Sequence, residues 1–458
     1  MKIKIENLGA VYRGELDMSK PLIIMCGPNS TGKTYVSHIL YSLYFNKYRI
    51  SPNCFTVLLK ELDVNGRAQL KKEYLDEFLE AEINVIKNFL DSVFGISEDE
   101  KKRLFRNFRL TLSLDDKNYK QVCEKKFACS LGIYEGQVRL KKEAGSDEIV
   151  FENQTGNQSL KLESLPFGEF LIYNLLHDCA FYPVNNVRML TVERNSIYTF
   201  SKELSLSRNE LIDRLQDAGN GKLDVMDILG QESKRYPMAI RESLKIANDL
   251  ENLQKYKSDF TAYAEQLEKD ILQGKLLINK YGSVEFQPET NTKTVRRLQI
   301  HMSSSIVKTL TSLILYLKHL ARKGDLLIID EPEMNLHPNN QILLARIFAR
   351  LVNHGLRLVI STHSDYIIRE FNNLIMAHEM ASDSKLSNIS VTYDKTELLD
   401  RKKLEVVYFS PLPSNNKKTV MKSVEVTRYG FNVSSIDDTI NHQNEVSDSL
   451  YEYLRYGL

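Results

Sequence analysis

One glycine-rich segment near the start of the chain constrains the fold more than any other feature. Residues 27–34 read Gly-Pro-Asn-Ser-Thr-Gly-Lys-Thr and fit the pattern G-x-x-x-x-G-K-[ST] of a phosphate-binding loop. The apolar run 21–26 precedes the loop and the amphipathic stretch 35–44 follows it, which is the order of strand, loop and helix that the motif requires. The sequence therefore predicts an α/β fold of the P-loop NTPase type.

The loop predicts a site for ATP and Mg²⁺. Its backbone N–H groups, with the helix N-terminus behind them, would form an anion cradle. Lys33 would reach the β- and γ-phosphates as a catalytic residue, and the Thr34 hydroxyl would ligate Mg²⁺. Glycine at two positions permits a tight turn against phosphate oxygens. The predicted nucleotide-binding residues are Gly27, Pro28, Asn29, Ser30, Thr31, Gly32, Lys33 and Thr34. The alternative is a chance match that binds nothing.

A second segment about three hundred residues later supplies two carboxylates. Residues 326–329 form a short apolar run that ends in Asp330 and Glu331, as expected of a buried parallel strand whose C-terminal end faces a ligand. Asp330 would hold Mg²⁺, directly or through water. Glu331 would act as the general base that orients and deprotonates the attacking water. A buried strand that ends in two solvated acids is the structural alternative.

A third strand is predicted beside this one. Residues 356–360 are apolar apart from Arg357 and lead to Ser361-Thr362-His363-Ser364, so His363 would lie near the γ-phosphate as a catalytic sensor. Between the two strands, residues 339–354 carry apolar positions near helical spacing, with Gly355 as the stop signal. We expect a right-handed strand–helix–strand unit.

Composition excludes several classes of protein. The chain has 458 residues and a formal net charge of +1, which gives no global argument for nucleic-acid binding. Its five cysteines are scattered without C-x-x-C spacing, so neither a zinc site nor a disulfide framework is predicted. No apolar run approaches the roughly 20 residues that span a bilayer, and the N-terminus alternates like a strand. We therefore expect a cytoplasmic protein without a membrane partner.

The pattern along the chain suggests six parts. Strongly helical, charged stretches interrupt the segments that carry the motifs, and turn residues separate short strand-like runs. We predict an N-terminal ATPase part (1–64), a helical insertion (65–110), a β-rich part of the core (111–195), a second helical insertion (196–275), the core with its late motifs (276–400), and a C-terminal hairpin and helix (401–458). The turn of the hairpin is predicted around 413–416 and the helix near 446–454.

At this point the chain resembles a known group, the ABC-type ATPases of the SMC, RecF and OLD kind, which are split by a large insertion. Within that group it is most similar to the stand-alone ATPase subunits of bacterial antiphage systems such as Septu, PARIS and the retron-associated operons. The residues that carry the resemblance are 27–34, 329–338 and 361–365. It implies an ABC-type core, with a mixed sheet flanked by helices and two helical insertions.

The resemblance also implies a signature helix. In ABC-type ATPases two subunits close head to tail around ATP, and each lends a signature helix to the other's γ-phosphate. The candidate is residues 302–308, in which Ser303, Ser304 and Ser305 stand where the family usually has Ser-Gly-Gly. Serine hydroxyls and free N–H groups at a helix start suit a phosphate. The alternative is a serine cap on an ordinary core helix.

Three weaker signals have two interpretations each. Residues 101–109 interleave cations with aromatics and would suit nucleic-acid phosphates, although the charged face of a helix explains them more simply. Arg194 would face nucleotide or a subunit interface, or else form a structural ion pair near Glu193. His337 lies where related ATPases make subunit contacts, and it is equally a structural histidine.

The leading hypothesis is a slowly hydrolysing ATPase that forms a homodimer or higher homo-oligomer on ATP and senses a trigger. We expect a separately encoded effector, a nuclease or toxin, because the chain lacks an acidic metal-nuclease cluster and an HNH-like histidine pair. Nucleic acid is a further candidate partner. The main alternative is a RecF-like DNA-repair ATPase that clamps DNA. A transporter subunit and a non-hydrolysing nucleotide switch fit the sequence less well.

Overall fold

A computed structural model describes most of the chain. The residues outside the description are 46–49, 51, 134–135, 156–159, 166, 202–235, 290–296, 382–392, 414 and 457–458.

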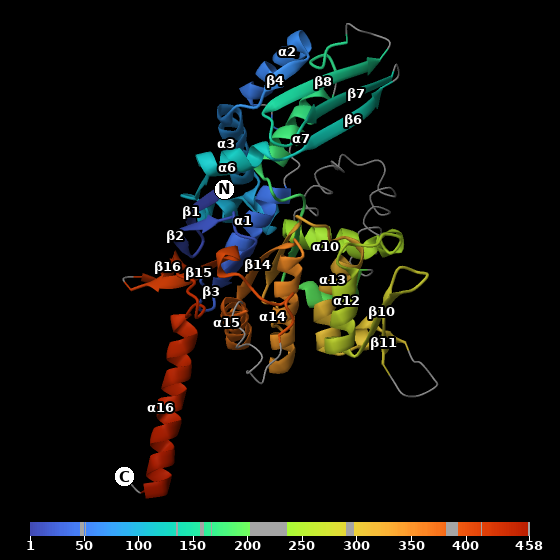
Figure 1. Cartoon of the computed structure of the whole chain (residues 1–458). Helices are drawn as coiled ribbons and strands as arrows, with labels where there is room; N and C mark the ends of the chain where they lie inside the picture. Colours follow the sequence, from blue (N-terminus) through green and yellow to red (C-terminus); the bar gives the residue numbers. More distant parts are fainter. Residues whose placement is uncertain are drawn as a thin grey trace, which may run out of the picture.

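A nine-stranded mixed sheet forms the centre of the molecule (Figure 1). Its strands, in spatial order, are β5 (Arg109–Ser113), β1 (Lys2–Leu8), β2 (Val11–Asp17), β16 (Asn415–Val424), β15 (Leu404–Leu412), β3 (Leu22–Cys26), β14 (Arg357–Thr362), β13 (Leu326–Asp330) and β9 (Val187–Leu190). From β15 to β9 all neighbours are parallel, whereas β5, β1 and β2 pair antiparallel. The mixed sheet predicted from the sequence is confirmed.

The parallel half of the sheet brings the sequence motifs together. β3 pairs with β14, and β14 pairs with β13, so the strands that precede the phosphate loop, the histidine and the two carboxylates are neighbours. Parallel strands end at the same edge of a sheet, where ligands bind in folds of this type. Helix α14 (Pro338–Asn353) connects β13 to β14, close to the predicted span 339–354.

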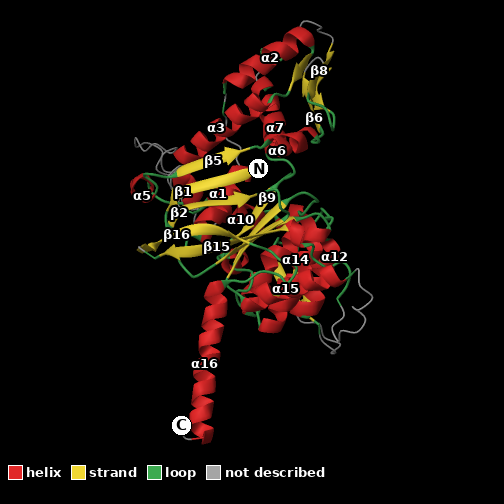
Figure 2. Cartoon of the chain, turned by 60° about the vertical axis from the view of Figure 1, so that its left-hand side comes forward, coloured by secondary structure: helices red, strands yellow, loops and turns green. Residues whose placement is uncertain are grey.

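Strand alternation divides the core into two layers. Ile23 and Met25 of β3 belong to the apolar cluster on one face, and Leu22, Ile24 and Cys26 belong to the cluster on the other. This is the period of two that a strand buried on both faces requires. Figure 2 shows helices on both sides of the twisted sheet. The first face packs against α1 (Lys33–Phe45) and α7 (Gly168–Ala180), and the second against α13 (Ser305–His319), α14 and α15 (Asp365–Met380).

A separate lobe stands beyond the β5 end of the central sheet (Figure 2). It holds a four-stranded sheet with the order β4 (Arg67–Gln69), β8 (Glu148–Thr155), β7 (Gly136–Lys142) and β6 (Phe127–Ile133). The sequence assigned 111–195 to the ATPase core, but β6, β7 and β8 do not join the central sheet. Alternation reveals that a segment is a strand without revealing which sheet it joins.

Helices of the first insertion connect this lobe to the core. Helices α2 (Asn53–Asn65) and α6 (Asp116–Cys123) belong to the lobe, and α3 (Lys72–Asn88) also contacts β5. Helix α4 (Leu90–Phe94) packs against α1, and α5 (Glu98–Leu104) follows it beside the central sheet (Figure 2).

The second insertion is described only in part. Residues 202–235, which are 34 of the 80 residues in the predicted helical span 196–275, lie outside the described residues. The remainder of this span, together with described residues up to 302 that the sequence assigned to the core, forms short helices and a three-stranded sheet beside α12 (Thr261–Leu267) and α13 (Figure 1). These elements are α10 (Met238–Asn248), α11 (Leu250–Leu253), α12, the π-helix η1 (Glu268–Leu272), β10 (Gly274–Ile278), β11 (Val284–Pro288), β12 (Leu298–Gln299) and the 3-10 turn η2 (Ile300–Met302).

The C-terminal part contains the predicted hairpin and helix. A 3-10 turn, η4 (Arg401–Lys403), leads into the β15–β16 hairpin. The final helix is α16 (Ser434–Tyr456), more than twice as long as the predicted span 446–454. Its first half is polar, so the apolar pattern identified only its end.

Candidate nucleotide-binding site

The phosphate loop joins β3 to α1 and depends on its two glycines. Gly27 and Gly32 have φ angles of 136° and 97°, a region that side chains rarely adopt. A Cβ at Gly27 would lie 2.7 Å from the carbonyl oxygen of Phe409, and one at Gly32 would lie 2.7 Å from Val11 Cγ2. The glycines therefore also let the loop pack against β15 and β2. Asn29 is exposed at the tip of the loop.

Lys33 closes this loop from within. Its Nζ donates hydrogen bonds to the carbonyl oxygens of Gly27, at 2.9 Å, and Pro28, at 2.7 Å. Burial lowers the pKa of the Lys33 ammonium, and the nearby carboxylates, Glu331 foremost, oppose this shift. Thr34, the next residue, is exposed. The arrangement places a cation inside the cradle and a free hydroxyl at its mouth, which suits a phosphate and its metal ion.

Asp330 ends β13 in a fully buried position. Its Oδ1 accepts hydrogen bonds from the hydroxyls of Ser37, at 2.9 Å, and Ser361, at 2.8 Å. Its Oδ2 is buried without a hydrogen-bond partner among the described residues. Burial raises the pKa of this carboxyl. An orphaned carboxylate oxygen is a costly feature that a hard cation would satisfy, so the donor set fits Mg²⁺.

A buried arginine holds the turn after β13. Arg194 donates to the carbonyl oxygens of Asp330 and Glu331, each at 2.6 Å, and of Thr191, at 3.0 Å. Burial lowers its pKa to about 10. Glu331 has a φ of 46°, which is uncommon outside glycine, and its N–H bonds to the Ser361 carbonyl at 3.0 Å. Arg194 thus braces a strained backbone at the predicted general base.

A second carboxylate, Glu333, holds the histidine in place. Its Oε1 accepts from the Thr362 hydroxyl at 2.8 Å and from the His363 N–H at 2.9 Å. His363 Nδ1 lies 3.4 Å from Glu333 Oε1 and 3.9 Å from Glu331 Oε1. The histidine and Glu331 side chains are 46% and 35% exposed, whereas that of Glu333 is 7% exposed. The two predicted catalytic groups are therefore adjacent and open to a ligand.

The three signature serines take different positions. Ser304 is the N-cap residue of α13, without a side-chain capping hydrogen bond, and Ser305 is the first residue of the helix; both are exposed. Ser303 is buried, and its hydroxyl donates to the Gln299 carbonyl at 3.3 Å. The free N–H groups at the start of this helix therefore have two exposed hydroxyls beside them. Asn335, in the loop after β13, donates to Thr309 of α13 at 3.0 Å, so this helix is tied to the carboxylate loop.

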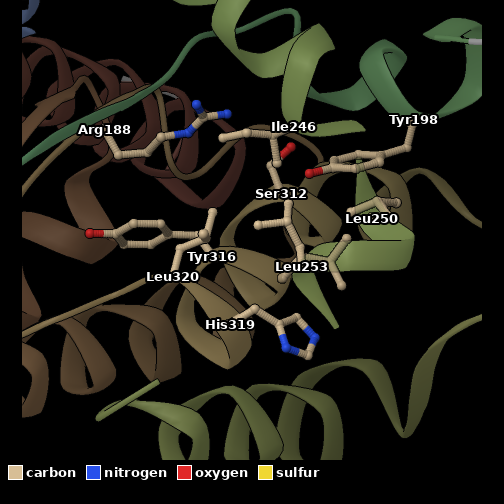
Figure 3. A pocket seen from close by; sticks show the side chains of 10 residues that line it. Arg188, Tyr198, Ile246, Leu250, Leu253, Ser312, Tyr316, His319 and Leu320 are labelled. Carbon is tan, nitrogen blue, oxygen red and sulfur yellow. The ribbon is translucent and has the colours of Figure 1, made fainter. Parts of the chain in front are cut away.

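The signature helix also packs against the second insertion. A small cavity of about 10 Å³ lies between α13, β9 and the α10–α11 region, lined by Arg188, Tyr198, Ser312 and Tyr316 among others (Figure 3). Arg188 donates to Ser243 of α10 at 2.9 Å. Strand β9, which also leads to Arg194, is thereby connected to both α13 and α10.

Four residues that shape the site were not singled out for these roles from the sequence. Arg194 donates hydrogen bonds to backbone carbonyls, in place of the structural ion pair near Glu193 that we considered. Ser37, Ser361 and Glu333 hold Asp330 and His363. Ser361 and Glu333 lay inside segments that the sequence did single out. Ser37 has only its position one helical turn after Lys33 as a signal.

Two of the weaker sequence signals, residues 101–109 and His337, have structural roles. Phe105 and Phe108, within 101–109, are buried and so unavailable to stack on bases, and Lys101 pairs with Glu98 at 2.7 Å. His337 is exposed and caps α14 by accepting from the Asn339 N–H at 3.4 Å. Its proposed subunit contact stays a prediction. No helix in the described part of the chain is long and apolar enough to cross a membrane.

A comparison with protein-family models adds the family. The model described as the AAA ATPase domain matches residues 1–368, which is well over half of the chain. The chain belongs to this family. Together with the sheet, this makes the chain an α/β P-loop ATPase with an ABC-type core, as the sequence predicted. The family implies nucleotide binding, and no curated protein matches the chain.

Several solved structures of SMC head domains are similar to the chain. The SMC head domain from Thermotoga maritima is 10% identical with a TM-score of 0.32, covering 93% of this chain and 98% of that one. An SMC head bound to the C-winged helix domain of ScpA is 12% identical, with a TM-score of 0.35 and the same coverage. An SMC head with an extended coiled coil, bound to the C-terminal domain of ScpA from Pyrococcus furiosus, is 12% identical with a TM-score of 0.33. This match covers 97% of this chain and 98% of that one. These low values support no functional argument.

Proposed function

We propose that this chain is a cytoplasmic ATPase subunit of a bacterial antiphage defence system. It binds ATP and Mg²⁺, dimerises on ATP, hydrolyses it slowly, and regulates a separately encoded nuclease or toxin. The observation that carries the ATPase part is the meeting of Lys33, Asp330, Glu331 and His363 at one edge of the parallel sheet. The defence role rests on the resemblance of residues 27–34, 329–338 and 361–365 to the antiphage subunits.

The chain's own groups supply the chemistry. Lys33 would exchange the carbonyls of Gly27 and Pro28 for β- and γ-phosphate oxygens. Thr34 and the free Oδ2 of Asp330 would hold Mg²⁺, which when bound neutralises phosphate charge. Glu331 would take the proton of the attacking water. His363, adjacent to Glu331, would donate to the γ-phosphate.

Dimer closure would complete the site. The exposed start of α13, with Ser304 and Ser305, offers a phosphate-binding surface to the nucleotide of a second subunit. Serines in place of glycines keep the backbone farther from the phosphate, which is consistent with slow hydrolysis. Asn335 connects this surface to the carboxylate loop of the same subunit. Closure would therefore be sensed at both sites.

The first experiment is the solution mass of the Glu331→Gln variant with and without Mg-ATP. Binding without hydrolysis should add an ATP-dependent association that the wild type shows only transiently. Lys33→Ala is the control, because it should bind ATP weakly and not respond. An unchanged mass together with an unchanged sedimentation coefficient of Glu331→Gln with ATP bound would contradict ATP-driven closure, whether or not two chains are already associated without nucleotide.

The defence role needs a test in cells. Bacteria that carry this gene with its neighbouring genes should resist phage, and should lose resistance when the partner gene is deleted or when Glu331→Gln replaces the wild type. Full resistance from this chain alone would contradict a separate effector. ATP-dependent duplex DNA binding that weakens steeply with salt, without any defence phenotype, would favour the DNA-clamping alternative.

A further inference from the structure

The C-terminal helix projects from the core as a single rod. Both views show α16 extending away from the sheet with the C-terminus at its far end (Figures 1 and 2). Its base is fixed, because the Phe431 N–H and carbonyl both bond to the Asn372 side chain of α15, at 3.0 and 2.9 Å, and Val433 is buried. The helix has 23 residues, so it is about 35 Å long. From Asn441 to Tyr456 every residue is exposed.

One side of this rod is apolar and uncharged. At 100° per residue, six apolar side chains fall within an arc of about 160° that contains no charged residue. They are Ile440, Val446, Leu450, Tyr451, Tyr453 and Leu454. The charged residues whose side chains the structure describes lie on the opposite arc, and they are Asp438, Glu445, Asp448, Glu452 and Arg455. We call the first set the apolar stripe. Leu450, Tyr453 and Leu454 are 60%, 63% and 85% exposed.

The sequence of α16 gives an isolated helix little stability. Most of its residues are Ser, Asp, Asn, Thr, Tyr or β-branched, which are mediocre helix formers. The strong helix formers are Gln443, Glu445, Leu450, Glu452, Leu454 and Arg455. Helical stability in proteins comes mainly from packing an amphipathic face. A solvated rod of this composition therefore requires a partner for its stripe.

Charge and shape point to one partner. The stripe carries no charge, and the acidic residues all lie behind it, so two copies can join their stripes while every carboxylate stays in water. Of the exposed large apolar side chains among the described residues, a third lie on α16. The stripe would bury on the order of 600 Å² per copy, at the lower limit for a stable interface.

We infer that α16 is a dimerisation helix that pairs with α16 of a second copy of this chain through the apolar stripe. The contact is isologous, with the same residues on both sides. It forms without nucleotide, and is thus distinct from closure around ATP at α13. The ATPase cores are then held together before ATP arrives, and closure becomes an intramolecular event at a high effective concentration.

The test is the solution mass of the full-length chain without nucleotide. We expect twice the chain mass at micromolar concentration. Leu450→Asp with Leu454→Asp should convert the protein to a monomer, because each change places a charge in the stripe. The matched control adds the same two charges to the polar side, Asn441→Asp with Ser449→Asp, and should remain dimeric. Both variants should bind ATP as the wild type does, since α16 lies outside the nucleotide site.

Two results would overturn the inference. One is a wild-type monomer without nucleotide across this concentration range. The other is an unchanged dimer in the stripe variant, which would place the contact elsewhere. If the wild type and the stripe variant both dimerised only with Mg-ATP, pairing through α16 would be contradicted and ATP-driven closure would stand.

Discussion

Burying the Asp330 carboxylate costs folding free energy, and this cost connects a single residue most directly to function. A fully buried carboxylate with an unpartnered oxygen opposes folding, and burial raises its pKa. A raised pKa in the folded state means that the native protein binds a proton more tightly than the unfolded chain. The associated stability is present at low pH and is lost as pH rises through the folded pKa. In the absence of a metal ion, the ionised Asp330 carboxylate therefore lowers the free energy of unfolding.

Asp330→Asn should reveal this cost. The amide does not titrate, so the melting temperature of the variant relative to wild type should be highest at neutral to alkaline pH. It should fall towards acidic pH, as the pH drops through the raised folded pKa and Asp330 becomes neutral too. Thermal denaturation of both proteins across this pH range, with a chelator present to remove metal ions, measures the difference in melting temperature. The other titrating groups affect both proteins equally and therefore cancel in this difference. The variant should also lose Mg²⁺-dependent hydrolysis. A difference that is constant with pH would contradict a raised pKa at Asp330.

Arg194→Met should damage both stability and catalysis. Removing the guanidinium takes its hydrogen bonds away from the buried carbonyls of Asp330 and Glu331, at a cost of about 1–3 kcal/mol, and releases the strained turn at Glu331. Displacing the base by about 1 Å would lower kcat about 100-fold, with ATP affinity nearly unchanged. Arg357→Met is the matched control. Arg357 is also buried and bonds to two carbonyls, those of Met18 and Lys20, but outside the site. It should melt earlier and retain kcat. Equal kcat losses in the two variants would indicate a general effect of unfolding.

At the scale of elements, the motif-bearing units were predictable because their signals are local. Strand β13, helix α14 and strand β14 follow directly from an apolar run, helical spacing and a glycine stop. The hairpin β15–β16 likewise follows from its turn. In each case the residues that determine the element lie within about thirty positions of it in the sequence. The rules for parallel strand–helix–strand units then determine which strands are neighbours.

Features that depend on distant partners were not predictable. Arg194 meets Asp330 across 136 positions in the sequence, and Ser37 meets it across 293. β6, β7 and β8 were identified as strands but assigned to the wrong sheet, because β4, their partner, lies within a stretch read as helical. The second half of α16 was found from its apolar residues, and the polar first half was missed.

The start of α13 gives a prediction for one element. Ser304→Arg should abolish ATP-dependent association of a Glu331→Gln protein that also carries Leu450→Asp and Leu454→Asp to remove pairing through α16. The reason is that a bulky side chain would occupy the surface meant for the partner's phosphate. ATP affinity within the subunit should not change, since the phosphate loop is untouched. Ser97→Arg is the control, because Ser97 is also an exposed N-cap serine. It lies on α5, a helix that contributes no residue to the nucleotide site, and the change there removes the hydrogen bonds between the Ser97 hydroxyl and Glu100. Sedimentation with and without Mg-ATP compares them. Normal association of Ser304→Arg would remove the signature role from this helix.

At the scale of the whole molecule, the nucleotide site and the β6–β8 lobe lie in different parts. The central sheet connects the phosphate loop, the β13 loop and α13, whereas the strands of the lobe form a sheet of their own, although their buried side chains belong to the same apolar cluster as those of β1 and α1. Closure on ATP should therefore change the first region and leave the β-strands of the second nearly unaffected.

Hydrogen exchange of the Glu331→Gln protein should show this division. With Mg-ATP, backbone amides of 27–34, 303–308 and 331–337 should exchange more slowly, because bound phosphate and the partner helix cover them. Amides of β6 and β7 should exchange as before. Lys33→Ala with Glu331→Gln is the control and should show no protection with ATP. Protection at 27–34 without protection at 303–308 would mean that ATP binds and the subunits do not close. Equal protection throughout β6 and β7 would mean that the lobe is part of the closing interface, so that ATP binding is relayed to whatever this lobe contacts.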